Sequence, residues 1–265
     1  MSVSEAVRAE IMRRVDACET EHDVRIIYCA ESGSRAWGFA SPDSDYDVRF
    51  IYVRNSDWYL SFDVERKRDV IEYPIVDEID INGWDLRKAL YLFTRTNGAL
   101  LEWLGSPIVY REVGNTAARL RELANSHVSD IALCYHYSHM ARRNAQQFLE
   151  KDEVKLKKYF YVLRPLLAIR WIQSGKGVPP VPFEELLYAE APKELIGEVE
   201  KLLEIKKKTS ELGAGPKIQA INDFVFSEFE RYGVQFSGQG RPEQESSERR
   251  EELNTVFRSA LSVQA

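Results

Sequence analysis

The chain has 265 residues, 44% of them hydrophobic and 29% charged, a composition that suits a globular protein of one large domain or two joined ones. Its three cysteines are far apart and have no C-x-x-C spacing, which excludes a disulfide framework and a structural zinc site. A net charge of −6 argues against a protein that coats nucleic acid non-specifically, and no apolar stretch is long enough to span a bilayer, so we expect a cytoplasmic protein with no membrane role.

The first 110 residues mix helical and strand patterns. Apolar residues at a spacing of four predict an amphipathic helix at the N-terminus, and short runs of β-branched residues predict strands. The expected elements are a helix at 3–18 and strands at 24–30, 46–53, 69–74 and 75–81. Asn82-Gly83 is expected to end the last strand, and Asp85 to cap the helix that follows it.

From about residue 114 onward the pattern is helical. Helices are expected at 129–150, 154–174, 192–209, 217–232 and 247–262. The chain after Gly238 is rich in Gln, Glu, Ser and Arg, which is typical of a flexible segment apart from that final helix. We therefore predict an α+β fold, with a mixed sheet and flanking helices followed by an all-helical C-terminal region. The predicted division is an α/β domain at 1–112, a helical domain at 113–237, and a flexible or partly helical tail at 238–265.

The segment after the first strand has the features of a phosphate-binding turn. Gly33-Ser34 comes where a strand is expected to end and a helix to begin, so unpaired backbone N–H groups would meet there at the positive end of a helix. Gly33 permits close backbone approach, and the Ser34 hydroxyl can donate to a phosphate oxygen. This pattern predicts a site for a triphosphate.

Asp45 and Asp47 lie two residues apart on the second predicted strand, so their side chains point to the same face. Two adjacent carboxylates repel each other unless a cation lies between them, and Mg²⁺ binds a few carboxylates together with substrate phosphates. A third carboxylate on a neighbouring strand would complete a two-metal site.

These residues resemble a known signature. An apolar residue before Gly33-Ser34, ten intervening residues and then Asp45-x-Asp47 is similar to the signature of the DNA polymerase β nucleotidyltransferase superfamily, whose third carboxylate is flanked by apolar residues as in Ile79-Asp-Ile81. Longer segments resemble a narrower family of predicted nucleotidyltransferases proposed to act in RNA repair (RlaP-like): Gly33-Ser-Arg-Ala-Trp-Gly38, Ser44-Asp-Tyr-Asp-Val-Arg49, Gly83-Trp-Asp-Leu-Arg-Lys88, Leu101-Glu-Trp-Leu104 and Tyr159-Phe-Tyr-Val-Leu-Arg-Pro165.

The resemblance implies an enzyme that transfers an NMP or dNMP from a nucleoside triphosphate, such as ATP, to an acceptor hydroxyl and releases pyrophosphate. Its metal ligands would be Asp45, Asp47 and Asp80, holding Mg²⁺ or Mn²⁺, and Gly33 and Ser34 would bind the nucleotide phosphates. Asp85 is a rival for the third carboxylate, because it also has apolar neighbours; we favour Asp80, because Asp85 is expected to cap a helix. The acceptor could be an RNA 3′ end, a protein or a small molecule. The alternatives are a non-catalytic module that senses nucleotides or binds a partner, and a toxin–antitoxin enzyme that transfers AMP to a protein.

Several cations are further candidates for nucleotide binding. Arg35 either contacts the triphosphate or faces solvent, and Arg49 either neutralises phosphate or pairs with a carboxylate on its own strand face. Lys158 belongs to a basic stretch with interleaved aromatic residues at 141–176, which suits a nucleotide or a nucleic-acid strand as well as a solvated helix face. Trp37 and Trp84 are expected to be core residues rather than platforms for base stacking.

Overall fold

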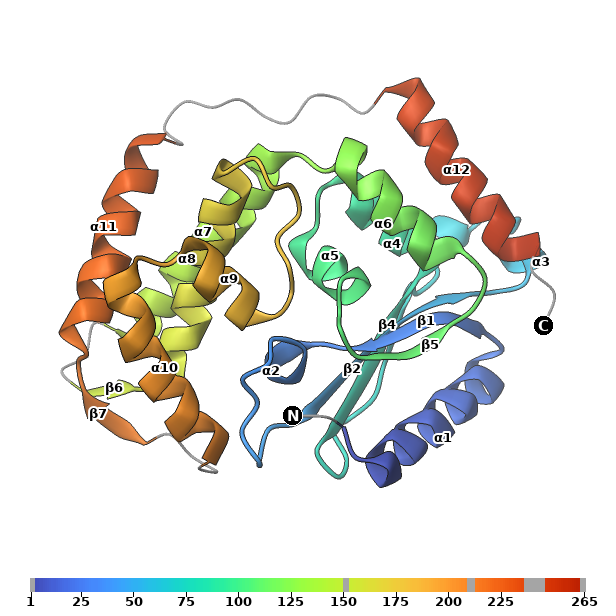
Figure 1. Cartoon of the computed structure of the whole chain (residues 1–265). Coiled ribbons are helices and arrows are strands. Elements are labelled where there is room, and N and C mark those ends of the chain that lie inside the picture. The colour runs from blue at the N-terminus through green and yellow to red at the C-terminus, as the bar shows by residue number, and fades with distance from the viewer. Residues whose placement is uncertain (1–2, 150–152, 209–212, 236–245, 263–265) are drawn as a thin grey trace. The chain divides into compact units, whose positions relative to one another are not determined.

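The computed structural model describes residues 3–149, 153–208, 213–235 and 246–262, and these form two compact units (Figure 1). The first unit takes the described residues of Met1–Ala36, Asp45–His127 and Gln244–Ala265, and the second takes those of Trp37–Ser44 and Val128–Glu243. The chain therefore enters the second unit twice. The first segment of the second unit, Trp37–Ser44, lies in the sequence between the predicted phosphate-binding turn and the predicted metal ligands.

The first unit is built on a five-stranded sheet with the order β3-β4-β2-β1-β5. The strands are β1 (Arg25–Glu31), β2 (Tyr46–Val53), β3 (Val70–Glu72), β4 (Ile79–Asp85) and β5 (Val109–Glu112). β2 and β4 run parallel, whereas β1 is antiparallel to both β2 and β5, and β3 is antiparallel to β4. The predicted mixed sheet with flanking helices is confirmed.

One face of this sheet is closed by α1 (Glu5–His22), as Figure 1 shows. The Ser4 side chain caps the start of α1, and the helix buries Ile11, Val15 and Cys18. These side chains belong to the same apolar core as Val48, Phe50 and Tyr52 of β2 and Ile79 and Ile81 of β4. Because side chains alternate along a strand, the intervening residues of β2 and β4 must point to the opposite face.

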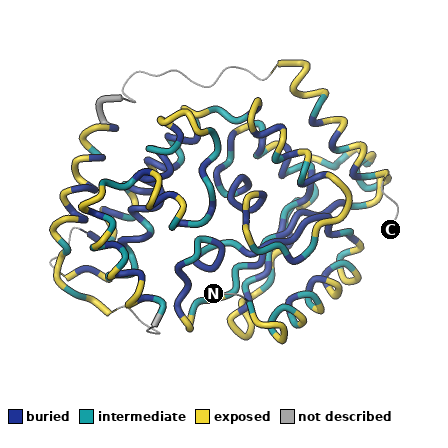
Figure 2. Tube along the Cα trace, in the orientation of Figure 1, coloured by how far each residue is buried: buried dark blue, intermediate teal, exposed yellow. Residues whose placement is uncertain are grey.

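The opposite face carries α4 (Leu86–Thr94), α5 (Gly98–Leu104) and α6 (Thr116–His127), with α12 (Ser247–Ser262) packed on α4 and α6 (Figure 1). Short elements α2 (Gly33–Ala36), α3 (Ser56–Tyr59) and η1 (Val64–Arg66) complete the unit. Figure 2 shows the sheet as its most continuously buried part and the outer side of α12 as exposed.

The second unit is mostly helical. It contains α7 (Asp130–Phe148), α8 (Lys158–Gln173), α9 (Phe183–Glu190), α10 (Lys193–Lys208) and α11 (Gln219–Gln235). A small antiparallel pair, β6 (Glu153–Lys155) with β7 (Ala214–Pro216), interrupts the predicted all-helical region, because strands of three residues leave no periodic signal in the sequence. The segment Trp37–Ser44 is held in this unit by two contacts. The Phe39 and Phe160 rings stack with 5.1 Å between their centres, and the Phe183 N–H donates a 2.8 Å hydrogen bond to the Trp37 carbonyl.

The two compact units divide the chain differently from the predicted domains. The first unit extends past residue 112 through α6, whose buried Leu120 and Leu123 pack it onto this unit. The final helix, predicted at 247–262, also belongs to the first unit and buries Leu253 and Val256. The flexible segment predicted after Gly238 falls largely on residues 236–245, which lie outside the described part of the chain. Nowhere in the described residues is a helix both long and apolar enough to cross a bilayer.

The strand predicted at 75–81 is displaced. Asp77 and Glu78 both have positive φ, at 52° and 61°, and form a tight turn, so β4 begins only at Ile79. The strand then continues through Asn82-Gly83 to Asp85 instead of ending there. Gly83 pairs with Phe50, and a Cβ at Gly83 would lie 2.3 Å from the Phe50 ring, so this glycine makes room for a core side chain.

Candidate active site

Asp47 and Asp80 lie directly opposite each other on the parallel strands β2 and β4. Arg49, two residues after Asp47 on the same face, donates from one guanidinium nitrogen to both carboxylates, at 2.9 Å to Asp47 Oδ1 and 2.7 Å to Asp80 Oδ2. The side chains of the two aspartates are 30% and 22% exposed. The structure therefore brings together two of the three predicted metal ligands, with a cation bound between them.

Burial raises the pKa of Asp47; the nearby Arg49 cation opposes this shift, whereas the charges of Asp80 and Asp45 add to it. The carboxylates are thus close enough to repel one another, and a bound cation relieves this repulsion. A set of carboxylate oxygens of this kind fits Mg²⁺ or Mn²⁺. Within the described residues, no three or more His, Cys, Asp or Glu side chains converge on a single metal-sized point. In this conformation Arg49 takes the shared position between Asp47 and Asp80.

Gly33 lies against the Asp47 carboxylate. Its φ is +59°, and a Cβ placed on it would be 2.0 Å from Asp47 Oδ2, so no larger residue fits without displacing this aspartate. The predicted helix after Gly33 is the single turn α2, in which Ser34 is buried. Because one turn carries little macrodipole, phosphate binding here would depend on the backbone N–H groups and the Ser34 hydroxyl more than on the dipole.

Arg35 does not face solvent, which was one of the two alternatives considered from the sequence alone. It is only 7% exposed, its guanidinium lies 3.8 Å from the centre of the Tyr46 ring, and its Nε donates to the Asp45 carbonyl at 3.2 Å. The expectation of a solvent-facing arginine is wrong. These contacts connect α2 with the start of β2 and fix the backbone that carries Asp45.

Glu31 is a residue of the site that the sequence analysis missed. It is fully buried at the end of β1, and its carboxylate accepts hydrogen bonds from the Asp47 N–H at 3.0 Å and from the Tyr110 hydroxyl. Burial raises its pKa. The Ser32 N–H also donates to the Asp47 carbonyl at 2.8 Å, so the backbone on both sides of Asp47 is held. The only signal in the sequence was a charged residue at the end of an otherwise apolar strand.

Asp85 has a different role from Asp80. It is 1% exposed, caps α4 by accepting from the Arg87 N–H at 2.8 Å, and accepts from the Tyr59 hydroxyl at 2.8 Å. Its position at the far end of β4 puts it about 16 Å along the strand from Asp80. This geometry supports the choice of Asp80 as the third carboxylate.

Lys158 belongs to the second unit, at the start of α8. Its ammonium lies 4.3 Å from the Phe148 ring centre and 4.6 Å from that of Tyr161. Burial lowers the pKa of Lys158, and the neighbouring Lys157 and Lys155 cations lower it further. This crowding of positive charge is compatible with an anion site, the role predicted for Lys158.

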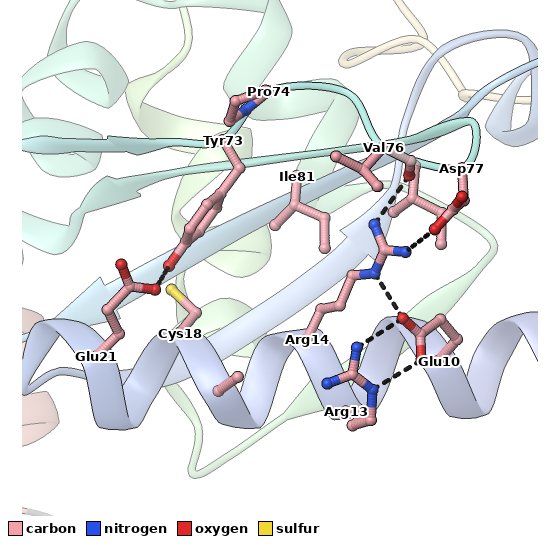
Figure 3. A pocket seen from close by; sticks show the side chains of 12 residues that line it. Glu10, Arg13, Arg14, Cys18, Glu21, Tyr73, Pro74, Val76, Asp77 and Ile81 are labelled. Atoms are coloured by element: carbon pink, nitrogen blue, oxygen red, sulfur yellow. Dashed lines mark hydrogen bonds and ion pairs between the residues drawn. The ribbon is translucent and has the colours of Figure 1, made fainter.

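A separate cavity of about 440 Å³ lies on the α1 side of the sheet (Figure 3). Its polar groups are already paired: Arg14 binds Glu10, Asp77 and the Val76 carbonyl, and the Tyr73 hydroxyl donates to Glu21. It shares no lining residue with the predicted site, and its cations already have acidic partners. The arrangement of carboxylates and glycine on the opposite face is therefore the stronger candidate for chemistry.

Comparisons with known proteins identify the family of the chain. The chain is 49% identical over 226 residues to the uncharacterized protein YcgL of Bacillus subtilis (strain 168), an alignment that covers 85% of this chain and 86% of that protein. A nucleotidyltransferase-like protein of Exiguobacterium sibiricum 255-15 aligns in structure over 94% of this chain and 89% of its own, with 11% identity and a TM-score of 0.35. Residues 7–259 match the RNA repair pathway DNA polymerase beta family (RlaP), and the chain therefore belongs to this family of polymerase β-type nucleotidyltransferases.

Proposed function

We propose that this protein is a metal-dependent nucleotidyltransferase that transfers an NMP or dNMP from a nucleoside triphosphate to an acceptor hydroxyl and releases pyrophosphate. The observation that carries the proposal is the placement of Asp47 and Asp80 on adjacent parallel strands around one cation, with the Asp47 carboxylate packed on Gly33. An RNA 3′ end is the acceptor we favour, because the family to which the chain belongs is described by an RNA repair pathway.

Each residue of the site has a role in this proposal. Gly33 and Ser34 bind the phosphates of the nucleotide, and Asp45, Asp47 and Asp80 hold Mg²⁺ or Mn²⁺. When bound, the metal ions would lower the pKa of the attacking hydroxyl and neutralise charge on the leaving pyrophosphate. Glu31 and Arg35 act through the backbone: Glu31 holds the Asp47 N–H and Arg35 holds the Asp45 carbonyl.

Arg49 supports the assignment of a cation site. A guanidinium that contacts both carboxylates shows that their oxygens converge on one positive charge. Because Arg49 is joined to the protein, it compensates for the repulsion in the absence of a divalent ion. Once a divalent ion neutralises the two carboxylates, Arg49 is free to pair with a phosphate oxygen. Arg49 would thus have both roles considered from the sequence, pairing with a carboxylate and neutralising phosphate.

A lysine cluster in the second unit supports a polyanionic substrate. Burial and the neighbouring Lys157 and Lys155 cations lower the pKa of Lys158, and burial with Lys157 and Lys158 nearby lowers the pKa of Lys206 to about 8. The Lys206 ammonium lies 4.8 Å from the Phe39 ring centre and 5.9 Å from that of Phe160, and it donates to the Phe39 carbonyl. Like charges at this density are costly, and a bound phosphate would reduce that cost. We therefore propose Lys158 as a phosphate contact.

The test is incubation with each radiolabelled NTP and dNTP, Mg²⁺ or Mn²⁺, and a mixed RNA pool. We expect label in RNA with the wild type and none with the Asp45→Asn/Asp47→Asn double variant. Asp57→Asn is the matched control, because Asp57 is an exposed aspartate on α3, outside the site. Label on protein instead of RNA would overturn the RNA acceptor, and equal labelling by the double variant would overturn the metal-ligand assignment.

A further inference from the structure

The catalytic face of β4 continues beyond Asp80. Ile79, Ile81 and Gly83 are buried on the α1 side, whereas the alternate residues Asp80, Asn82 and Trp84 are only half-buried. Asn82 donates from its amide to Asp80 Oδ1 at 3.3 Å. One strand face therefore presents, in order, a proposed metal ligand, an amide and a large aromatic ring.

Trp84 is held in place by a second tryptophan. Its ring stacks on Trp103 of α5, with 3.8 Å between ring centres and 29° between planes, and Trp103 is 4% exposed. The inner ring is thus fixed in the core while the outer ring keeps part of its surface in solvent. Trp84 was expected to be a core residue, but its half-buried position leaves it accessible to a ligand. A rigid, backed indole costs little conformational entropy when a flat ligand binds to it.

The strand register places Asn82 and Trp84, here called the shelf, on the side of the carboxylates that faces away from Gly33. Gly33 follows β1, whose last residue Glu31 pairs with Val48, so the phosphate-binding turn lies beyond the N-terminal end of β2. Trp84 pairs with Ile51, further along β2 in the opposite direction, and lies on the far side of β2 from β1. Asp47 and Asp80 thus lie between the turn and Trp84, whose Cα is about 13 Å along the strand from that of Asp80.

In-line phosphoryl transfer determines what can occupy the shelf. The attacking and leaving oxygens lie on opposite sides of the phosphorus atom. If Gly33 and Ser34 hold the triphosphate, the pyrophosphate leaves on their side, and the attacking hydroxyl must approach from the side of β4. Asn82 and Trp84 are therefore placed for the acceptor and not for the leaving group.

We propose that Asn82 and Trp84 form a subsite for the terminal nucleotide of a single-stranded RNA acceptor. Its base stacks on Trp84, and its ribose lies near Asn82, whose amide can bind a sugar hydroxyl. This inference rests on the proposed function and names the acceptor class of the same site. Single-stranded RNA ends are commonly recognised in this way, because their unstacked bases can stack on aromatic side chains.

The test measures binding of two fluorescent oligoribonucleotides, one with an intact 3′-terminal base and one with an abasic 3′-terminal nucleotide, in the presence of Mg²⁺. Wild-type protein should bind the intact strand about 5- to 100-fold more tightly than the abasic strand. Trp84→Leu should lose this preference, and Trp84→Phe, which keeps a ring, should retain most of it. Tyr91→Leu is the matched control, since Tyr91 is an aromatic residue on α4 that is 57% exposed.

Measuring both oligoribonucleotides with wild type and with Trp84→Leu isolates the contact between the base and the Trp84 ring. A general loss of protein stability would lower the affinity for both oligoribonucleotides equally. A Trp84→Leu protein that still prefers the intact strand would overturn the proposal, as would Trp84→Phe losing the preference completely. Affinity for the nucleoside triphosphate is measured in the same proteins. If Trp84→Leu weakens the affinity for the nucleoside triphosphate instead, then Trp84 stacks on the base of the triphosphate, and the proposed acceptor subsite is wrong. Absence of metal-dependent triphosphate binding in the wild type would instead contradict the nucleotidyltransferase function itself.

Discussion

The two faces of the sheet in the first unit use the same strands for different purposes. On the α1 side, β2 and β4 contribute Val48, Phe50 and Ile81 to a closed apolar core. On the other side, the alternate residues Asp47, Arg49 and Asp80 form a charged cluster that solvent reaches. The comparison shows how two of the proposed ligands are kept rigid: Asp80 lies between the core residues Ile79 and Ile81, and Asp47 precedes the core residue Val48.

The comparison predicts that substitutions on the core face reduce stability and substitutions on the charged face reduce transfer. The largest effect should come from the core face. Phe50 is fully buried with its ring against Gly83, so Phe50→Ala should lower the free energy of unfolding by about 3–5 kcal/mol. Urea denaturation measures this loss. Transfer by the protein that remains folded should persist, and its disappearance in well-folded protein would show that the faces are not independent.

The next largest effect concerns the two carboxylates of β4. Asp80→Asn should lower the transfer rate on the order of 10²–10³-fold, the usual cost of removing one group that stabilises charge in the transition state. Asp85→Asn is the matched change on the same strand; asparagine can still cap α4, so transfer should change little, whereas the Tyr59 hydroxyl loses its acceptor and stability should fall by about 1–3 kcal/mol. Single-turnover rates decide between them. A reversed outcome would make Asp85 the functional carboxylate.

A substitution at Gly33 tests how closely the proposed phosphate-binding turn must approach Asp47. In Gly33→Ala the new Cβ would displace the carboxylate, and a misplacement of about 1 Å can cost on the order of 10²-fold in rate. Gly38→Ala is the control, because Gly38 also has positive φ, at 85°, but no atom lies within 4 Å of its Cβ position. Both variants should lose about 1–2 kcal/mol of stability from backbone strain. Equal transfer rates in the two variants would argue against the close approach.

The smallest effect is expected at Arg49. Arg49→Gln leaves Asp47 and Asp80 without their cation, so the metal-free protein should lose about 1–3 kcal/mol of stability. Added Mn²⁺ should then raise the melting temperature of Arg49→Gln by several degrees more than that of the wild type. Arg13→Gln removes an exposed ion pair with Glu10 and serves as the control. No difference between the two variants in their response to Mn²⁺ would contradict the shared cation position.

The sequence predicted the parts of the fold that depend on local pattern. The second strand and the Asp85 cap were predicted correctly, because alternation and capping are set by neighbouring residues. The start of β4 was not, since a turn with two positive-φ residues, neither of them glycine, gives no familiar signal. Trp37–Ser44 joins the second unit through contacts with residues more than a hundred positions away, which no local pattern contains.

The positions of the residues in the candidate site were predicted to a similar degree. Spacing on one strand placed Asp47 and Arg49 on the same face, and the apolar neighbours of Asp80 identified it as a strand residue. The support from Glu31 could not be predicted, because its partners Asp47 and Tyr110 lie on other strands. The burial of Arg35 likewise could not be predicted, because its partner Tyr46 lies beyond the segment Trp37–Ser44, which belongs to the second unit.

Direct measurement of metal binding tests the central claim, that the face carrying Asp47 and Asp80 holds divalent ions together with a nucleoside triphosphate. Electron paramagnetic resonance can follow free Mn²⁺ as protein is added in the presence of a non-hydrolysable triphosphate, for the wild type and for Asp47→Asn/Asp80→Asn. We expect the wild type to remove Mn²⁺ from solution and the double variant to remove little. Equal Mn²⁺ binding by two well-folded proteins would contradict the assignment of this face as the metal centre.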